Sequence, residues 1–311
     1  MKKFRLFNGL VITVALLGLP VISSTAFGAD DVEEVVAVGS RREARSVGDS
    51  PAPVDIITGS DFVNQGAMDL PDMIRTLVPS FNVNTQPISD AATLIRPANL
   101  RGLPPDNMLV LVNGKRRHRG AVISFLGSGI SDGAQGPDIS AIPSIALKQV
   151  EVLRDGASAQ YGSDAIAGIM NFVLRDNSEG TQLEIRSGEY KEGDGDAWRI
   201  AANVGMPFTS AGYANLSVEL QDSKATSRSV QRADAQGLYD GGNTAIWNYP
   251  DPAQIWGSPD VSDDYKFVVN LGVSLDESKD FYLFGNYGER NVLGGFFFRN
   301  PTNRGGVFST D

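Results

Sequence analysis

The sequence has no cysteine and only one histidine, His118. Without cysteine there are no disulfide bonds, no thiolate catalysis and no cysteine–zinc sites. A single histidine argues against a histidine-rich metal centre and against a Ser-His-Asp triad. Cationic residues are also few, because 27 Lys and Arg stand against 37 Asp and Glu and give a net charge of −10. Nucleic-acid binding needs a clustered positive surface. We therefore expect no catalytic residue, no metal site, no cofactor and no nucleic-acid partner.

Long apolar runs are also missing, since no segment reaches the ~20 apolar residues of a membrane helix. The nearest is Leu10–Leu19, which follows Lys2, Lys3 and Arg5 and precedes a stretch of small residues. This order is typical of a secretory signal peptide, which we expect at residues 1–28. A membrane anchor is the alternative, but the run is too short for one. Any later membrane span must be a β-strand.

The remaining chain divides into an arm (29–50), a mixed region (51–176) and a region of alternating strands (177–311). An apolar fraction of 41% argues against wholesale disorder. The mixed region predicts a compact α+β domain. We expect strands at 54–58, 109–112, 150–153 and 169–174, a helical turn capped by Ser60, a helix opened by Asp69 and Pro71, and a helix at 140–148. Asn113-Gly114 predicts a tight type I′ hairpin turn.

Residues 177–311 contain five runs in which apolar and polar residues alternate, such as Leu183 and Ile185 against Glu184 and Arg186. Short connections at 207–212 and 276–280 alternate with a long polar loop at 221–264. Strands of about ten residues joined in this way are typical of outer-membrane barrels. A soluble β-sandwich also alternates, so the pattern alone leaves both architectures open. The acidic loop at 191–196 lacks EF-hand spacing, and we expect an exposed hairpin loop.

Residues 138–175 read DISAIPSIALKQVEVLRDGASAQYGSDAIAGIMNFVLR. This long block resembles the plug domain of TonB-dependent outer-membrane receptors. Three further segments resemble parts of these receptors in the expected order. They are a TonB box at 33–39, an Arg-Gly motif at 100–103, and an apolar strand and turn at 109–116.

The resemblance implies an α+β plug domain followed by antiparallel transmembrane β-barrel strands. Plugged barrels have 22 strands, and the five strands expected here cannot close even the smallest ~8-strand barrel. We therefore expect the N-terminal portion of a receptor, in the outer membrane of a Gram-negative bacterium after Sec export. It would take up a scarce solute, would not be an enzyme, and would work with TonB, ExbB, ExbD and outer-membrane lipid.

The resemblance also assigns residues in the arm and the plug. The TonB box comprises Glu33, Glu34, Val35, Val36, Ala37 and Val38. Its valines favour an unpaired extended segment that could add to the edge of a TonB sheet, and a plain linker is the alternative. Arg101, Glu151 and Arg154 are expected to lock the plug to charged barrel residues. Gly102, Gly114, Gly156, Gly162 and Gly168 are expected to serve turns or close backbone approaches.

A basic cluster follows the predicted hairpin, with Arg116, Arg117, His118 and Arg119 as candidate ligand-facing residues. Arg96, in a second candidate loop at 84–98, joins this set. Such a cluster could attract an anionic or metal-chelated ligand such as a ferric siderophore. The alternative is that the cluster pairs with barrel acids.

Two other classes remain open at this stage. One is a soluble periplasmic binding or interaction module, in which the plug folds alone and the tail is disordered. The other is a secreted enzyme, for which the sequence offers no catalytic motif. The sequence does not identify the transported substrate.

Overall fold

The structure is a computed structural model that describes residues 35–36, 45–46, 54–83, 93–124, 129–246, 252–276, 278–295 and 297–301. The predicted signal peptide, most of the predicted arm and residues 84–92 of the second candidate loop lie outside the described residues. Within these described ranges, no helix is both long enough and apolar enough to cross a membrane.

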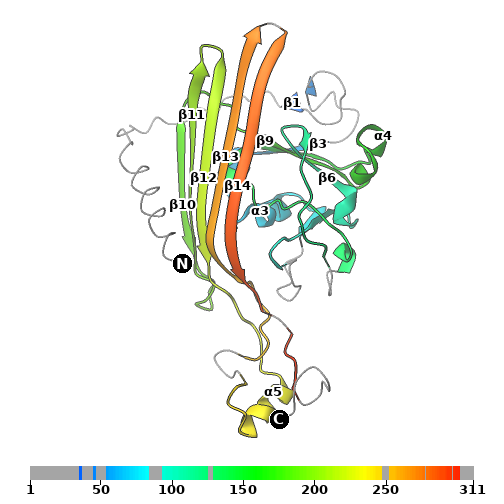
Figure 1. Cartoon of the computed structure of the whole chain (residues 1–311), viewed down its shortest axis with the longest axis vertical. Coiled ribbons are helices and arrows are strands. Elements are labelled where there is room, and N and C mark those ends of the chain that lie inside the picture. The colour runs from blue at the N-terminus through cyan, green and yellow to red at the C-terminus, as the bar shows by residue number, and fades with distance from the viewer. Residues whose placement is uncertain are drawn as a thin grey trace. The chain divides into compact units, whose positions relative to one another are not determined.

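The region from 54 to 174 is built on a five-stranded sheet in the order β3-β8-β9-β6-β7 (Figure 1). Its strands are β3 (Val54–Thr58), β8 (Leu147–Leu153), β9 (Gly168–Leu174), β6 (Met108–Val112) and β7 (Lys115–Arg116). β6 and β9 are parallel, and the other neighbours are antiparallel. β6 is wholly buried, as expected of an apolar run covered on both faces. β8 is buried except at Lys148, although it also carries Gln149 and Glu151.

One face of this sheet forms the main core with α2 (Gly59–Val63), α3 (Leu70–Leu77) and the hairpin of β4 (Phe81–Val83) and β5 (Ala98–Leu100). Asp69 caps α3 as predicted, because its side chain accepts a hydrogen bond from the backbone N–H of Asp72 at 3.1 Å. The cap of α2 is Thr58 and not Ser60, because the Asp61 carboxylate binds back to the Thr58 N–H. A smaller apolar cluster on the other face lies beneath α4 (Ser158–Tyr161).

The helix predicted at 140–148 is wrong. Only a 3₁₀ turn forms, at Ser144–Ala146, and Leu147 already begins β8. Leu147 pairs with Leu174 and is fully buried. Pairing and burial in the sheet therefore override the local helical signal.

The predicted Asn113-Gly114 turn is confirmed, with φ of 47° and 72°. Gly102, Gly162 and Gly168 also have positive φ, whereas Gly156 does not. Gly168 is the most constrained, because a Cβ there would lie 2.3 Å from the Leu153 carbonyl oxygen. At Gly156 the nearest atom would be 3.5 Å away, which is ordinary contact. The structure gives no steric reason for glycine at 156.

Residues 181–293 form a second five-stranded sheet, β10 (Thr181–Gly188), β11 (Ala197–Thr209), β12 (Gly212–Ser223), β13 (Asp260–Asp276) and β14 (Lys279–Leu293). The strands pair in sequence order and all are antiparallel. Figure 1 shows them side by side. The five predicted strands are therefore confirmed, although each is longer than its alternating core. β10 and β14 are the edges, so the described sheet is open.

The two faces of this second sheet have opposite polarity. Apolar side chains on one face are exposed, including Leu183 at 62%, Ile185 at 69% and Leu283 at 46%. The other face carries buried polar and charged residues, among them Arg199, Glu219 and Lys266. A soluble sandwich has the reverse arrangement, with its apolar face inside. A wall with an apolar outer face and a polar inner face is the arrangement of a transmembrane barrel.

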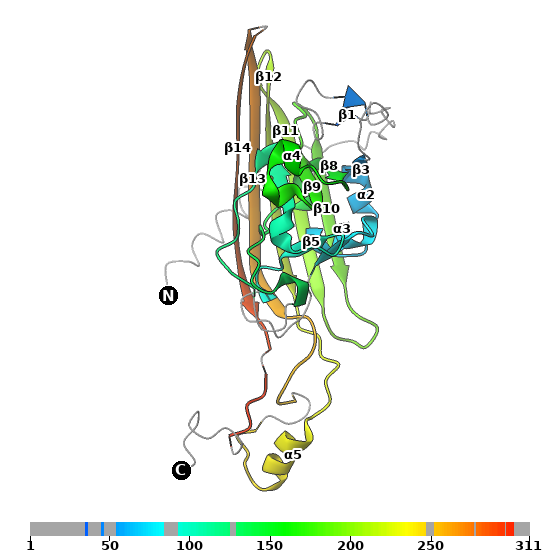
Figure 2. The same cartoon turned by 90° about the vertical axis from the view of Figure 1, so that its right-hand side faces the viewer.

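The connections differ in length as predicted. Tight turns join β11 to β12 and β13 to β14, and a long loop runs from 224 to 259. This loop contains α5 (Ala233–Asp240), which was not predicted from the sequence. In both views α5 lies beyond the end of the sheet where β12 ends (Figures 1 and 2). The 191–196 loop is a hairpin connection, and Arg228 pairs with its Glu192 and Asp194.

Candidate functional site

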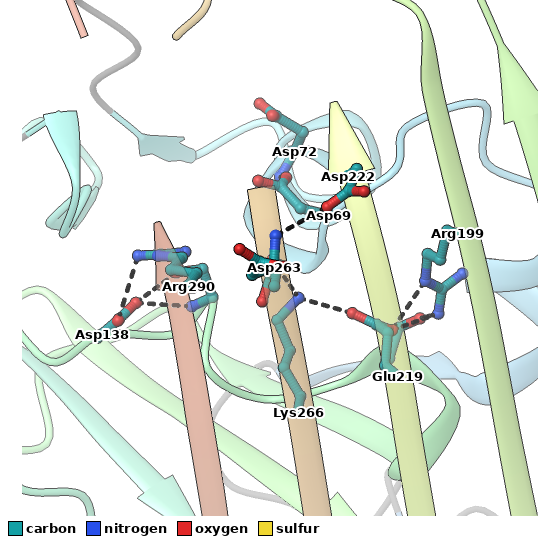
Figure 3. A network of polar contacts seen from close by, with 12 residues as sticks. Asp69, Asp72, Asp138, Arg199, Glu219, Asp222, Asp263, Lys266 and Arg290 are labelled. Atoms are coloured by element: carbon teal, nitrogen blue, oxygen red, sulfur yellow. Dashed lines mark hydrogen bonds and ion pairs between the residues drawn. The ribbon is translucent and has the colours of Figure 1, made fainter. Parts of the chain in front are cut away.

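The inner face of the second sheet carries a line of alternating charges, which we call the charge ladder. Figure 3 shows three of its members, Arg199, Glu219 and Lys266. The ladder crosses four strands and consists of Arg186, Glu184, Arg199, Glu219, Lys266 and Asp264. Both carboxylate oxygens of Glu219 are used: Oε2 accepts from Arg199 at 2.7 Å and Oε1 accepts from Lys266 at 2.6 Å. The ladder is electrically neutral, which is the condition for burying charges at a tolerable cost.

The ladder is bonded to the plug through Arg199. This side chain is fully buried, and its Nη2 donates to Ser144 Oγ at 2.6 Å. Ser144 lies in the 3₁₀ turn before β8, within the block that carries the family resemblance. A charged donor on a buried hydroxyl is among the stronger hydrogen bonds in proteins. The second sheet (181–293), which we call the wall, and the region from 54 to 174, which we call the plug, are therefore joined at a buried polar contact.

Arg186 makes a second plug contact from β10. Its guanidinium donates to the backbone carbonyls at and after the C-terminal end of α2, including Phe62 O at 3.0 Å and Val63 O at 2.9 Å. The carbonyls of Gln65 and Ala67 also accept from it. The last carbonyls of a helix lack partners within the helix, and a cation also suits the negative end of the helix dipole. Arg186 thus supplies a C-terminal cap from outside the plug.

A third contact joins β14 to the plug. Arg290 pairs with Asp138 at 3.3 Å and also donates to Ser140 Oγ and to the Leu94 carbonyl. The Arg290 side chain is only 15% exposed. Its contacts join two plug segments that are far apart in the sequence, as Figure 3 shows for Asp138.

An uncharged seam of asparagines completes the interface. Asn113 Nδ2 donates to Asn270 Oδ1 on β13 at 3.2 Å, and Asn270 Nδ2 donates to the Arg175 carbonyl at 2.9 Å. Asn215 on β12 donates to Asn177 Oδ1 at 2.8 Å and accepts from Asn203 on β11 at 2.6 Å. Asn177 lies in the segment between β9 and β10, so the seam holds the connection between plug and wall.

Two of the three predicted lock residues have partners within the plug. Arg154 pairs with Asp55 on β3, at 2.6 Å, and both side chains are 40% exposed. Glu151 accepts hydrogen bonds from Gln149 and Asn171, which both lie in the plug. Arg101 is exposed and has a φ of 55°. Arg154 therefore does not use a barrel partner here, and a lock role for Arg101 and Glu151 stays a prediction.

The basic cluster is mostly neutralised within the plug. Arg116 pairs with Asp164, and Arg119 lies 3.6 Å from Asp106. Arg117 donates to Asn286 Oδ1 on β14 at 2.6 Å. Burial lowers the pKa of Arg117, and Asp138 offsets part of this effect. His118 is exposed. These contacts do not favour anion capture. They also differ from the alternative of pairing with barrel acids, because the acidic partners Asp164 and Asp106 both lie in the plug.

Arg96, the other candidate ligand-facing residue, is part of a buried triad. Its side chain is 15% exposed and pairs with Asp69 and Asp72 at the start of α3. Burial opposes its charge, but the two carboxylates raise its pKa above the ordinary value. Burial likewise opposes ionisation of Asp69, but Arg96 lowers the pKa of Asp69 overall. Burial and the nearby Asp69 charge instead raise the pKa of Asp72. The triad thus holds one carboxylate whose ionised form is stabilised, Asp69, and one whose ionised form is destabilised, Asp72.

This triad borders a cavity of about 400 Å³ between plug and wall. Its plug side includes Asp69, Asp72 and Arg96, and its wall side includes Gln221 and Asp264. The volume lies within the range of small-molecule sites, about 300–1,000 Å³. No group of three or more metal-ligating side chains occurs in the part of the chain that the structure describes. This cavity is the candidate solute site.

The predicted TonB box is described only at β1 (Val35–Val36). The prediction that this segment is unpaired is wrong. Val35 and Val36 pair antiparallel with Ser46 and Arg45 of β2 (Arg45–Ser46). The arm supplies its own partner strand, so the extended backbone that valine favours is satisfied locally. Glu33, Glu34, Ala37 and Val38 lie outside the described residues.

The charged inner-face residues Arg186, Arg199, Glu219, Lys266 and Arg290 were not predicted as a set. The three arginines among them contact the plug. A signal for the set existed, because each residue occupies a polar position of an alternating strand. Charged residues at inward positions of neighbouring strands indicate a polar lumen. The sequence does not reveal the strand register, which brings Glu219 directly opposite Lys266.

Comparison with known proteins agrees with this architecture. Residues 46–169 match the family model described as TonB-dependent Receptor Plug Domain. The vitamin B12 transporter BtuB of Photobacterium profundum is 24% identical over 213 residues, which are 68% of this chain and 31% of that protein. The ferric enterobactin receptor PirA of Pseudomonas aeruginosa is 30% identical over 162 residues, 51% of this chain and 21% of that protein.

Solved structures show the same fold. A mutant of the ferric enterobactin receptor PfeA of Pseudomonas aeruginosa, in complex with enterobactin, has a TM-score of 0.57 at 19% identity. That similarity covers 77% of this chain and 33% of PfeA. The chain matches about a third or less of the length of these relatives.

Proposed function

Residues 46–169 belong to the plug-domain family of TonB-dependent receptors, and on this premise we propose that the protein takes up a scarce solute across the outer membrane. The observation that carries the proposal is the polar interface between plug and wall. Buried ion pairs gain little net stability relative to apolar packing, yet they fix a unique arrangement. An interface of this kind holds the plug closed and can break and re-form.

The solute in this proposal is a small organic molecule or a metal chelate. It binds in the cavity between α3 and strands β12 and β13, on the side where the long 224–259 loop emerges. Long loops of outer-membrane barrels lie outside the cell and short turns lie in the periplasm. In this proposal the cavity faces the exterior, and Arg96 of the plug and Arg290 of β14 belong to its lining.

The energy for opening comes, in this proposal, from TonB with ExbB and ExbD, acting on the arm. The arm precedes β3, which is an edge strand of the plug sheet. TonB would grip the 33–38 segment by adding a strand to its own sheet. Because Val35 and Val36 are already paired with β2, TonB would have to displace that pairing. Breaking the β1–β2 pairing would therefore cost part of the free energy that TonB binding supplies.

The protein is placed, in this proposal, in the outer membrane of a Gram-negative bacterium after Sec export, in contact with outer-membrane lipid. The alternative of an isolated periplasmic plug module requires a disordered tail. The long paired strands β10–β14 and their bonds to the plug speak against that alternative. In this proposal, lipid covers the exposed apolar face of strands β10–β14.

The test is binding of a purified TonB C-terminal domain to the full chain in detergent micelles. Val36→Pro removes a backbone donor needed for strand addition, and we expect binding to weaken by at least tenfold. Val36→Thr keeps the β-branched side chain and the N–H, and should bind like the wild type. Absence of binding by the wild-type chain, or equal binding by all three chains, would overturn the proposal.

A further inference from the structure

The cavity between plug and wall contains an unused acceptor. Gln221 on β12 is 6% exposed, and its Oε1 has no hydrogen-bond partner. Its cross-strand neighbour is Asp264, which is also buried and also lines the cavity. A buried acceptor without a donor is unfavourable and uncommon in native proteins. An occupant that supplies the missing donor would relieve this cost.

The two least exposed cationic side chains at the cavity are already held by acceptors. Arg96 is held by two carboxylates, and Arg290 by Asp138, Ser140 and the Leu94 carbonyl. An anion entering the cavity would have to compete for Arg96 and Arg290 with the acceptors that already hold them. Lys224 contacts Asp260 at 3.4 Å, but its side chain is 63% exposed, so water screens this pair.

Acceptors, in contrast, are left over. Besides Gln221 Oε1, the buried Oδ1 of Asp72 receives no hydrogen bond and has a 3.3 Å ionic contact with Arg75. The Arg75 side chain is 49% exposed, so water screens this contact and it contributes little. The buried polar atoms left without a partner at the cavity are therefore acceptors, of partial and full negative charge, whereas its weakly paired cations, Arg75 and Lys224, are exposed.

We propose that this cavity recognises a ligand carrying one or more ammonium groups, whose N–H donors are received by Gln221 Oε1 and the Asp72 carboxylate. The inference rests on the proposed function, because it assigns a chemical class to the solute of that site. It also reverses the ligand charge expected from the basic cluster. Burial and the Asp69 charge raise the pKa of Asp72, and a bound cation would lower this pKa and so favour the ionised carboxylate.

The experiment uses the full chain in detergent micelles with three probes: spermidine as the ammonium donor, citrate as the anion and 1,8-octanediol as the neutral donor. Isothermal titration calorimetry measures each dissociation constant. Spermidine should bind most tightly. Gln221→Met keeps the side-chain length and the net charge but removes the acceptor, and should weaken spermidine binding about tenfold, the loss expected for one hydrogen bond to a charged group.

Gln236→Met is the matched control, because Gln236 lies on α5 and bonds to Asp240 at the surface. It should leave spermidine binding unchanged. Equal binding to both variants would mean general adsorption to an acidic chain and would overturn the inference, as would tighter binding of citrate or of octanediol. Gln221→Met should not lower the denaturation midpoint, since the residue it replaces is unsatisfied. Because TonB binding is measured on the arm, failure of this inference leaves the proposed function standing.

Discussion

Replacing Glu219 by glutamine tests whether the charge ladder is a buried network. The substitution keeps the size of the side chain but removes the one anion that Arg199 and Lys266 share. Those two side chains are 0% and 3% exposed, so water cannot replace the lost charge. Removing one partner of a buried pair costs about 3–5 kcal/mol. We expect a value near the lower end, about 3 kcal/mol, because Arg199 keeps Glu184 and Lys266 keeps Asp264.

The assay is equilibrium unfolding in urea with the chain in detergent micelles, followed by tryptophan fluorescence. Trp198 neighbours Arg199 on β11, so the signal reports on the wall itself. Asp260→Asn is the matched control, because it breaks the Lys224–Asp260 pair, in which the lysine side chain is 63% exposed. Such pairs contribute about 0–1 kcal/mol.

A double variant separates loss of charge balance from loss of packing. Glu219→Gln with Lys266→Met removes one anion and one cation, so the remaining ladder is again neutral. We expect it to recover at least about 1 kcal/mol relative to Glu219→Gln alone, the size of coupling found between contacting charges. If Glu219→Gln costs no more than Asp260→Asn, the ladder is solvated and the reasoning is refuted.

Three further predictions concern the plug. Gly168→Ala should destabilise the chain by about 1–3 kcal/mol, through strain at positive φ and a backbone clash, while Gly156→Ala should change stability by less than about 1 kcal/mol; thermal unfolding of the two variants gives the comparison. Arg186→Lys should raise the protease sensitivity of α2 without unfolding the wall, because an ammonium cannot reproduce the planar fork that caps several carbonyls; equal protection of both chains would argue against the cap. Asp69→Asn should cost about 1.5–3 kcal/mol at pH 7, whereas Asp72→Asn should be neutral or stabilising. The pKa of Asp69 is lowered in the folded chain, so its contribution to stability is present above its unfolded pKa and is lost on acidification. The pKa of Asp72 is raised, so its contribution is lost as the pH rises. The urea midpoints of the two variants should therefore converge at low pH.

The sequence was sufficient to locate the strands of the wall. Alternation through residues such as Leu183 and Glu184 located all five strands, because a half-buried strand imposes a period of two whatever surrounds it. Alternation did not decide between sandwich and barrel. That decision needed the accessible surface, which shows that the apolar face is the exposed one.

Local signals succeeded where the local backbone decides the outcome and failed where tertiary contacts decide it. Asn113-Gly114 and the Asp69 cap were predicted because turn and cap chemistry depends on a few adjacent residues. The expected helix at 140–148 failed because Leu147 is drawn into the sheet beside Leu174. Arg154 has a partner, as expected, but that partner is Asp55, 99 residues away, and no sequence pattern specifies such a pairing.

The most direct test of the account is whether alternate residues of one strand face lipid and plug. The chain has no cysteine, so single cysteines at Leu283 and Phe284 of β14 can each carry a fluorophore in lipid vesicles. Leu283 is exposed on the apolar face, and Phe284 packs against the plug core. We predict that brominated lipid quenches the probe at 283 strongly and the probe at 284 weakly. Equal quenching at both positions, or none at 283, would contradict a strand that faces lipid on one side and the plug on the other.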